Sequence, residues 1–205
     1  LVPLKTSDID LKRLSGIRQE CTVTLDGVAE QGEILFTDYG ISGICVMQLS
    51  GIYNRAVSEG KRIDAVYVDL IPSMNDEQKL NTIKKLINRF PERKPEDAIA
   101  GLLKKQLAQC VVARSDGSCE SIASVIGNFR ISLNGSLGFE NAQVTSGGVK
   151  LSSLTDSLEA VESHGVFVCG EAVNVDGICG GYNLHWAWIS ALLVSDAILD
   201  LLEVD

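Results

Sequence analysis

The stretch from Gly165 to Leu193 contains the residues whose types and spacing best suit ligand chemistry. Two acids, Glu171 and Asp176, follow a short apolar run, and the pair Gly180-Gly181 comes just before a long apolar segment. Glycine lets a backbone approach a ligand closely because no Cβ intervenes. The start of a helix presents free N–H groups at the positive end of its dipole. This combination favours a site for a polyhydroxylated or anionic ligand.

Two elements are expected to position these residues. Val166 to Cys169 is a short apolar run closed by Gly170, which is typical of a buried strand. Tyr182 to Leu202 contains neither Pro nor Gly, so we predict a single helix there. Taken alone, the arrangement is also that of an ordinary strand–helix crossover with a Gly-rich turn, because isolated Gly motifs are weak signals.

The full string is more specific than its parts. It reads GVFVCGEAVNVDGICGGYNLHWAWISA and closely resembles GLYFAGEVLDVDG-x-CGGYNLQWAWSSG, the C-terminal signature of the BaiN-like (also called YhiN-like) NAD(P)/FAD-dependent oxidoreductases, which include aminoacetone oxidase-like flavoproteins. The stretch around Phe139 to Val149 resembles the family pattern GFExAQVTxGGV. Gly32 to Ser50 resembles GELLFTHxGLSGPAVLQLS, but Asp38 stands where the family usually has His, and Ile44-Cys45 where it has Pro-Ala.

The resemblance implies that FAD is the cofactor and that two segments contact it. As acids at the end of a predicted strand, Glu171 and Asp176 are assigned to hydroxyls of the ribityl or ribose groups. The N–H groups from Gly181 to Leu184 are expected at the pyrimidine edge of the flavin, where negative charge develops on reduction. Tyr182 and His185 are weaker candidates than the glycines and the acids. The expected cofactor-binding residues are Thr145, Gly147, Gly148, Glu171, Asp176, Gly180, Gly181, Tyr182, Asn183 and Leu184.

No residue is assigned a catalytic role, and no metal ligand is predicted. Trp186 and Trp188 are expected to pack in the core, and stacking on the flavin is the alternative. A flavoprotein of this kind also needs a strand–GxGxxG–helix unit for the FAD pyrophosphate, and the sequence contains no such fingerprint. The chain therefore looks like the C-terminal half of a flavoprotein. On its own it is expected to be inactive and to bind FAD with a dissociation constant no better than roughly millimolar, since the phosphates lack their helix N-terminus.

Two other functions stay open at this point. The chain could be a binding or interaction module without redox activity, or a glycine-rich fold for a different nucleotide. The absence of a P-loop Lys motif disfavours the latter. For the flavoprotein we expect a small-molecule substrate, with NAD(P)H as a candidate reductant.

The expected fold class is mixed α+β. The resemblance implies a β-barrel-like insert domain bearing a helical subdomain, followed by the C-terminal βα part of a Rossmann-like FAD-binding domain. The predicted divisions are 1–74 (β-rich insert domain, first part), 75–127 (helical subdomain), 128–140 (return strands) and 141–205 (C-terminal segment). An apolar strand at Val166 to Cys169 without sheet neighbours invites pairing, so we expect self-association through residues 141–205.

Periodicity supplies the remaining elements. Helical spacing predicts a helix over Asn75 to Phe90, a second running from Pro95 through Val111, and a short third capped by Ser118. Asp26-Gly27 and Asn134-Gly135 are hairpin turn signals. Apolar patterns predict strands at Arg18–Leu25, Glu30–Phe36, Ile63–Ile71 (buried on both faces) and Arg130–Leu133.

Composition narrows the possible partners. The net charge of −9 argues against nucleic acids and anionic membranes. Basic residues do cluster at Arg89 to Lys94 and at Lys104-Lys105, but within helices that also carry acids, which is typical of a solvated face. The apolar run at Ala187 to Leu193 is too short to cross a bilayer, and no signal peptide is predicted. Six cysteines without CxxC spacing and only two histidines favour reduced thiols, a cytoplasmic protein and no zinc or Ser-His-Asp site.

Overall fold

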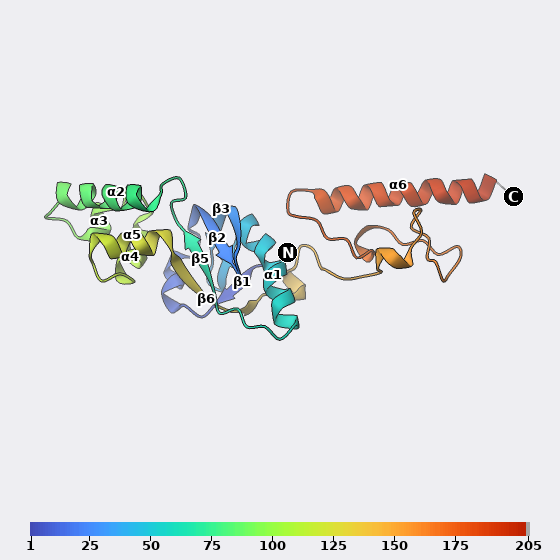
Figure 1. The fold of residues 1–205 in the computed structure, drawn as a ribbon, viewed down its shortest axis with the longest axis horizontal. Coiled ribbons are helices and arrows are strands. Elements are labelled where there is room, and N and C mark those ends of the chain that lie inside the picture. The colour runs from blue at the N-terminus through green and yellow to red at the C-terminus, as the bar shows by residue number, and fades with distance from the viewer. Residues whose placement is uncertain (204–205) are drawn as a thin grey trace. The chain divides into compact units, whose positions relative to one another are not determined.

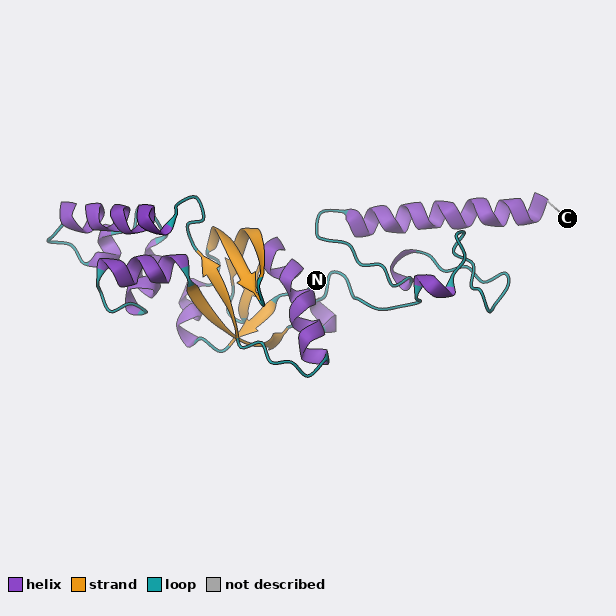
Figure 2. Ribbon diagram, viewed as in Figure 1, coloured by secondary structure: helices purple, strands orange, loops and turns teal. Residues whose placement is uncertain are grey.

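Six antiparallel strands close into a barrel in the computed structural model, which describes residues 1 to 203 (Figures 1 and 2). Around the barrel the strand order is β1-β4-β3-β2-β5-β6. Strands, in chain order, are β1 (Leu4–Thr6), β2 (Arg18–Leu25), β3 (Val28–Phe36), β4 (Gly40–Ser42), β5 (Ala65–Asp69) and β6 (Phe129–Ser136). The α-helices are α1 (Ile44–Ser58), α2 (Asp76–Arg89), α3 (Pro95–Ala98), α4 (Lys105–Ala113), α5 (Cys119–Gly127) and α6 (Tyr182–Glu203). The 3₁₀ helices are η1 (Ile9–Leu14), η2 (Phe139–Asn141), η3 (Leu151–Ser153) and η4 (Gly170–Ala172). The mixed α+β class expected from the sequence is confirmed.

Contacts divide the chain into two units, and each is described by itself. The barrel unit contains Val2–Asn141, and the C-terminal unit contains Leu1 and the residues from Ala142 onward. Within the barrel unit, Figure 1 shows α2 to α5 as a helical subdomain beside the barrel. One continuous core joins the two parts of this unit. Its largest fully buried side chains include Phe36, Phe129, Ile34, Leu70 and Ile83.

The hairpin of β2 and β3 follows directly from its turn. Pairing runs from Arg18 opposite Leu35 to Leu25 opposite Val28. Asp26 and Gly27 form the two-residue connection with φ of 49° and 80°, and positive φ at both central residues is the hairpin turn that matches the strand twist. The predicted strands and turn of this hairpin are confirmed.

Two predictions about the strands need correction. β5 is buried on one face only, because Tyr67 between buried Val66 and Val68 is 43% exposed. Asn134-Gly135 is not a turn: both residues lie inside β6, where Gly135 pairs with Lys5 of β1. Pairing with β1 extends β6 past the residues that, read locally, indicate a hairpin.

A glycine determines how α1 meets the barrel. Gly43, the residue before α1, has φ of 109°, and a Cβ there would lie 2.2 Å from the carbonyl oxygen of Glu33 on β3. Only glycine allows this approach. It lets α1 bury Cys45, Leu49 and Tyr53 against the barrel.

The helices of the subdomain begin where capping residues stand. Asn75 caps α2 in a reciprocal capping box with Gln78, and the side chain of Ser118 accepts the N–H of Ser121 at the start of α5 at 3.1 Å. Both N-termini are as predicted. The helix predicted from Pro95 through Val111 is instead two helices, α3 and α4, separated by a turn around Gly101. Glycine lowers helix stability by about 1 kcal/mol relative to alanine, which favours this break.

Arg114 connects the helical subdomain to the barrel. Its guanidinium donates to Asp10 at 2.8 Å and lies 4.4 Å from the centre of the Phe129 ring. This bond holds the pKa of Asp10 below its ordinary value. The thiol of Cys110 also donates to Asp10, at 3.2 Å. Burial is the main reason that the pKa of Cys110 rises to about 12.

The C-terminal unit has a small core and one long helix. Its buried apolar residues are Leu154, Leu158 and Val173. The predicted helix from Tyr182 is confirmed as α6. The predicted strand at Val166 to Cys169 is wrong: in the described chain these residues form no ladder, and Phe167 makes one isolated bridge to Glu159. An apolar run becomes a strand only where neighbouring strands satisfy its N–H and C=O groups.

Helix α6 also corrects the argument about membranes. Tyr182–Leu202 is long and apolar enough to cross a bilayer by length and composition, with a mean hydropathy of 1.3 over its most apolar window. The apolar segment is longer than the run from Ala187 to Leu193, because isolated polar residues such as Ser190 do not end it. Helices that pack inside soluble proteins can have the same length and composition. These two properties therefore do not assign α6 to a membrane.

Candidate functional site

Two loops that are distant in sequence are joined in the C-terminal unit. The first is Thr145–Val149 and the second is Gly170–Asp176. The N–H of Val149 donates to the carbonyl oxygen of Ala172 at 2.9 Å, and the N–H of Asn174 donates back to the carbonyl oxygen of Val149 at 2.8 Å. The structure therefore brings together the two segments in which the sequence predicted cofactor contacts.

Both predicted acids take part in this junction. Oε1 of Glu171 accepts the N–H of Thr145 at 2.9 Å, and Oδ2 of Asp176 accepts the hydroxyl of Ser146 at 2.9 Å. Both carboxylates are exposed. Each acid therefore has a structural role through one oxygen, while its second oxygen makes no hydrogen bond among those of the described residues.

Gly148 makes the junction sterically possible. Its φ is 110°, and a Cβ would lie 2.4 Å from the carbonyl oxygen of Ala172. Neighbouring Gly147 has φ of 120°, but a Cβ there would meet no atom within 4 Å. Both positions have a backbone conformation that favours glycine. They differ in packing, because only Gly148 lies against the second loop.

The loop before α6 is fixed by one side chain. The carboxamide of Asn183 accepts the N–H of Gly177 at 2.8 Å and donates to the carbonyl oxygen of Gly177 at 3.0 Å. The first α-helical bond at this end runs from the N–H of His185 to the carbonyl of Gly181. The N–H groups of Tyr182, Asn183 and Leu184 therefore precede the helical bonds and are the groups that a ligand can use.

Two residues of α6 hold the second loop, and the sequence analysis did not assign them this role. The indole N–H of Trp186 donates to the carbonyl oxygen of Gly170 at 3.0 Å, and the N–H of Gly170 donates to the hydroxyl of Ser190 at 2.8 Å. Ser190 is fully buried. One signal in the sequence could have indicated this role of Ser190: it is a small hydroxyl residue in an apolar helix, four positions after Trp186 and so on the same face.

The predicted residues thus have different environments. Tyr182 and Leu184 are 59% and 72% exposed, and the side chain of His185 is exposed as well. Trp186 is half-buried and packs against the small core as expected. Trp188 was predicted to be buried and is 72% exposed, because it lies on the face of α6 opposite to the loops. The FAD contacts of all ten predicted residues stay predictions.

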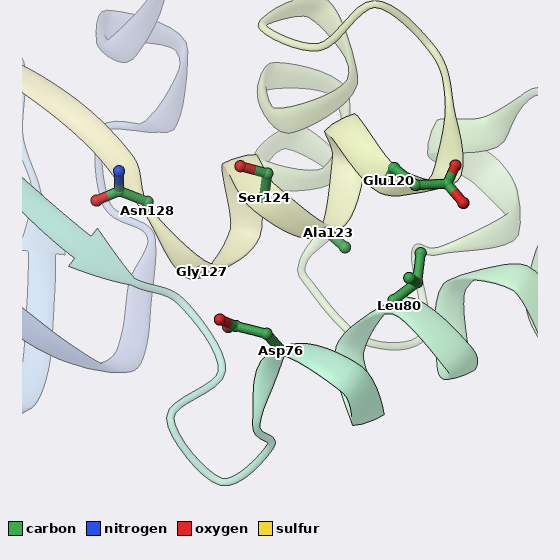
Figure 3. Close-up of a pocket in the computed structure, with 7 residues that line it drawn as sticks. All are labelled: Asp76, Leu80, Glu120, Ala123, Ser124, Gly127 and Asn128. Carbon is green, nitrogen blue, oxygen red and sulfur yellow. The ribbon is translucent and has the colours of Figure 1, made fainter.

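A separate cavity lies in the barrel unit, between α2 and α5. It has a volume of about 280 Å³, and Figure 3 shows the seven residues that line it. Beside it, the buried ammonium of Lys79 pairs with Asp69 at 2.7 Å and with Asp76 at 3.7 Å. Gly127 faces this pair, since a Cβ there would lie 3.3 Å from Asp76. Lys79 thus ties β5 to the start of α2 by ion pairs, which is a structural role.

Comparison with known proteins identifies the chain's family. Residues 1–144 match the family described as "HI0933-like protein barrel and H2TH domain". The chain belongs to this family of BaiN-like (YhiN-like) flavoprotein oxidoreductases. The barrel and the helical subdomain described above are the parts of the structure that the match covers.

Curated relatives extend the likeness through the C-terminal unit. The chain is 30% identical over 215 residues to the 3-dehydro-bile acid delta(4,6)-reductase of Clostridium scindens, covering 96% of this chain and 52% of that protein. It is 31% identical to the ribosomal RNA dihydrouridine synthase of Haemophilus influenzae, over 93% of this chain and 49% of that protein. The chain is 29% identical to the enzyme of the same name from Escherichia coli, over 89% of this chain and 46% of that protein. The chain therefore spans about half the length of these relatives.

Proposed function

We propose that this chain supplies the barrel, the helical subdomain and the FAD-contacting C-terminal segment of a flavin-dependent oxidoreductase. The observation that carries the proposal is the junction of Thr145–Val149 with Gly170–Asp176. Both segments resemble the family's signatures, and four hydrogen bonds join them.

The residues of the junction fit the hydroxyl-rich part of FAD. Glu171 and Asp176 are exposed, and each uses one carboxylate oxygen in the junction, which leaves the other oxygen to accept a hydroxyl. At Gly147 and Gly181 the side of the backbone where a Cβ would stand is open, with no atom within 4 Å. The N–H groups at the start of α6 supply donors for the flavin edge. The phosphates need the strand–GxGxxG–helix unit, which this sequence does not contain.

FAD, when bound, supplies the hydride or electron transfer, and NAD(P)H is the reductant that we propose. The chain's own residues hold and orient the cofactor. Asn183, assigned to the cofactor from the sequence, is better explained as a positioning residue, because its carboxamide is used by Gly177. Trp186 and Ser190 position the second loop in the same way through Gly170.

The relatives' names support one reaction class. Reduction of a delta(4,6) unsaturated bile acid and synthesis of dihydrouridine both saturate a carbon–carbon double bond. We propose the same class for this protein: hydride transfer to a double bond conjugated with a carbonyl group. Asp38, which stands where the family usually has His, lies exposed between β3 and β4 of the barrel unit. The two substrates differ in size and charge, so the reaction class does not choose between them.

The test uses the full-length protein. We expect a yellow preparation whose flavin spectrum is bleached anaerobically by NADH or NADPH and restored by an unsaturated substrate. A colourless protein that does not take up added FAD would contradict the proposal and support an interaction module.

A variant locates the cofactor within this protein. Glu171→Ala should weaken FAD retention by one charge-assisted hydrogen bond, about 1.5–3 kcal/mol, or at least tenfold. Glu162→Ala is the matched control, since Glu162 is an exposed acid of the same unit and has no predicted contact with FAD. Equal flavin content of both variants after dialysis would show that Glu171 does not bind the cofactor.

A further inference from the structure

Two buried thiols meet where α1 joins the barrel. Cys21 lies on β2 and Cys45 is the second residue of α1, and both are fully buried free cysteines. Cys21 stands directly opposite Gly32 of β3, and a Cβ at Gly32 would lie 3.5 Å from the Cβ of Cys45. Opposite residues of an antiparallel pair share a face, with Cβ positions about 4.5–5.5 Å apart. Cys45 therefore lies beside the side chain of Cys21.

Two glycines allow this close approach of helix and strand. Gly43 precedes α1, and the absence of a Cβ there leaves room for the carbonyl oxygen of Glu33 on β3. Gly32 lies directly before Glu33 and has no side chain, so Cys45 occupies the space beside it. The position of Cys45 next to Cys21 is thus set by the backbones of β3 and α1.

The two thiols differ in their chemical environment. The thiol of Cys21 donates to the carbonyl oxygen of Gly32 at 3.5 Å and also forms a hydrogen bond with the sulfur of Cys45. This thiol–thiol bond, together with the N–H groups of Val46 and Cys45 at the start of α1, lowers the pKa of Cys45 although burial acts in the opposite direction. The same bond and burial raise the pKa of Cys21. A nucleophilic thiolate beside a protonated partner thiol is the arrangement of a redox-active pair.

The pair is close to the protein surface at one point. Ile44, the residue before Cys45, is 57% exposed, and helix ends open more readily than helix centres. A small oxidant can therefore reach Cys45 when the first turn of α1 opens. The family pattern has Ala at the position of Cys45, so the pair is a feature of this chain and not of the family signature.

We propose that Cys21 and Cys45 are an oxidative modification site at which a hydroperoxide forms a reversible disulfide between β2 and α1. The Cys45 thiolate attacks one oxygen of hydrogen peroxide and the O–O bond breaks. This leaves a sulfenic acid on Cys45, and the other oxygen leaves as water with the proton that the Cys45 thiol released. The sulfur of Cys21 then attacks the sulfur of Cys45, the S–O bond breaks, and a second water leaves with the proton of Cys21.

The electrons balance in this sequence. Two thiols lose two electrons, and one peroxide gains them to become two waters. A dithiol reductant reverses the reaction by thiol–disulfide exchange. The bond fixes the start of α1 to the barrel wall and closes the loop that contains β3 and β4. This inference concerns the barrel unit alone and does not depend on a flavin.

Peptide mapping of the 205-residue chain tests the bond directly. The folded protein is treated with hydrogen peroxide, its remaining thiols are alkylated in denaturant, and a glutamate-specific protease then cuts between the two cysteines, after Glu30 and Glu33. Mass spectrometry should show the peptides of Cys21 and Cys45 joined as the main linked species. Dithiothreitol should separate them.

Thermal unfolding gives a second measurement. Peroxide should raise the midpoint of the wild type by about 5–10 °C, because the disulfide constrains the unfolded chain, and dithiothreitol should reverse the shift. Cys45→Ala, which restores the residue of the family pattern, should show neither the linked peptides nor the shift. The matched control is Cys169→Ala, which removes an exposed thiol and should keep both.

A third variant separates the roles of the two thiols. In Cys21→Ala no partner thiol captures the sulfenic acid, so Cys45 should be oxidised further to sulfinic acid, which dithiothreitol does not reverse. The same sulfinic acid as the main product in the wild type would overturn the proposal. So would the absence of linked peptides at a peroxide dose that oxidises Cys169 completely, or their formation only in urea.

Discussion

The two units of this chain bury their apolar residues to very different degrees. In the barrel unit, strands and helices share one core, and large side chains such as Phe36 are fully buried. Among the described residues of the C-terminal unit only three apolar side chains are buried, and α6 exposes a stripe of large side chains. Members of this stripe are Leu184, Trp188, Leu192, Leu199 and Leu202. The same chain thus contains a complete hydrophobic core and a surface that resembles half of one.

The two units are held together in different ways. The barrel unit closes its hydrogen bonds within itself, since every strand has two neighbours. The C-terminal unit consists mainly of loops. The hydrogen bonds of Gly170 with Trp186 and Ser190, and the small core beneath α6, hold these loops to the helix. An exposed apolar stripe of this size marks a surface that another molecule or segment covers. We therefore expect stability to reside in the first unit and association in the second.

Separating the units should have the largest effect. Residues 1–141 on their own should unfold cooperatively, with a midpoint within a few degrees of that of the whole chain, because their core is complete. Residues 142–205 on their own should show no cooperative transition, since three buried side chains cannot offset the entropy of ordering the loops. Thermal unfolding followed by circular dichroism checks both. Light scattering should show self-association for the whole chain and a monomer for residues 1–141. Equal oligomeric states of the two proteins would contradict self-association through the C-terminal unit.

A pair of aromatic truncations sharpens the comparison. Phe36→Ala should reduce the free energy of unfolding by about 3–5 kcal/mol, because it leaves a cavity in a closed core. Trp188→Ala should change the unfolding free energy by less than about 0.5 kcal/mol, while reducing self-association. Urea titration and light scattering measure the two quantities. A destabilisation by Trp188→Ala as large as that by Phe36→Ala would show that the stripe is packed in solution.

Alkaline pH should weaken the barrel unit through Cys110. Its thiol has a pKa raised to about 12 in the folded protein, against about 8.5 for a free thiol. The folded state therefore keeps a proton that the unfolded chain loses, so stability present below about pH 8.5 declines as pH rises toward 12. At about pH 10.5, two pH units above the free-thiol value, this amounts to roughly 2.7 kcal/mol. Urea titrations at about pH 8 and 10.5 should show a smaller decline for Cys110→Ala than for the wild type, and no such relief for Cys169→Ala, whose thiol is exposed. Identical declines in all three proteins would refute this assignment.

The smallest effect distinguishes two adjacent glycines. In the full-length protein, Gly148→Ala should lower FAD retention about tenfold, because its Cβ would collide with Ala172 and part the two loops. Gly147→Ala carries similar backbone strain, of order 1–3 kcal/mol, but has open space for its Cβ. It should therefore lose less FAD than Gly148→Ala. Equal losses, read from flavin absorbance after gel filtration, would mean that the junction of the loops does not shape the site.

Local signals in the sequence predicted much of the barrel unit. The Asp26-Gly27 turn, the caps at Asn75 and Ser118 and the alternation of β2 depend on neighbouring residues, and all are present in the structure. Errors arose where distant pairing decides. β6 runs through Asn134-Gly135 because β1 pairs with it there. The apolar run at Val166 forms no ladder because no strand of the described chain pairs with it.

The candidate site was predicted in part for the same reason. The motif resemblance indicated both loops, and the structure joins them. It could not show that one oxygen of Glu171 and one of Asp176 are used by the other loop. Nor could it show that Asn183 holds Gly177, or that Ser190 supports Gly170. Such contacts depend on the three-dimensional course of loops, for which a single sequence carries no periodic signal.

Hydrogen exchange of the full-length protein with and without FAD tests the central claim most directly, namely that the joined loops and the start of α6 contact the cofactor. We predict that FAD slows amide exchange at Thr145 to Val149 and at Gly177 to Leu184, while the helical subdomain around α4 and α5 exchanges at an unchanged rate. Binding of FAD that protects other segments and leaves both of these stretches unaffected would contradict the account.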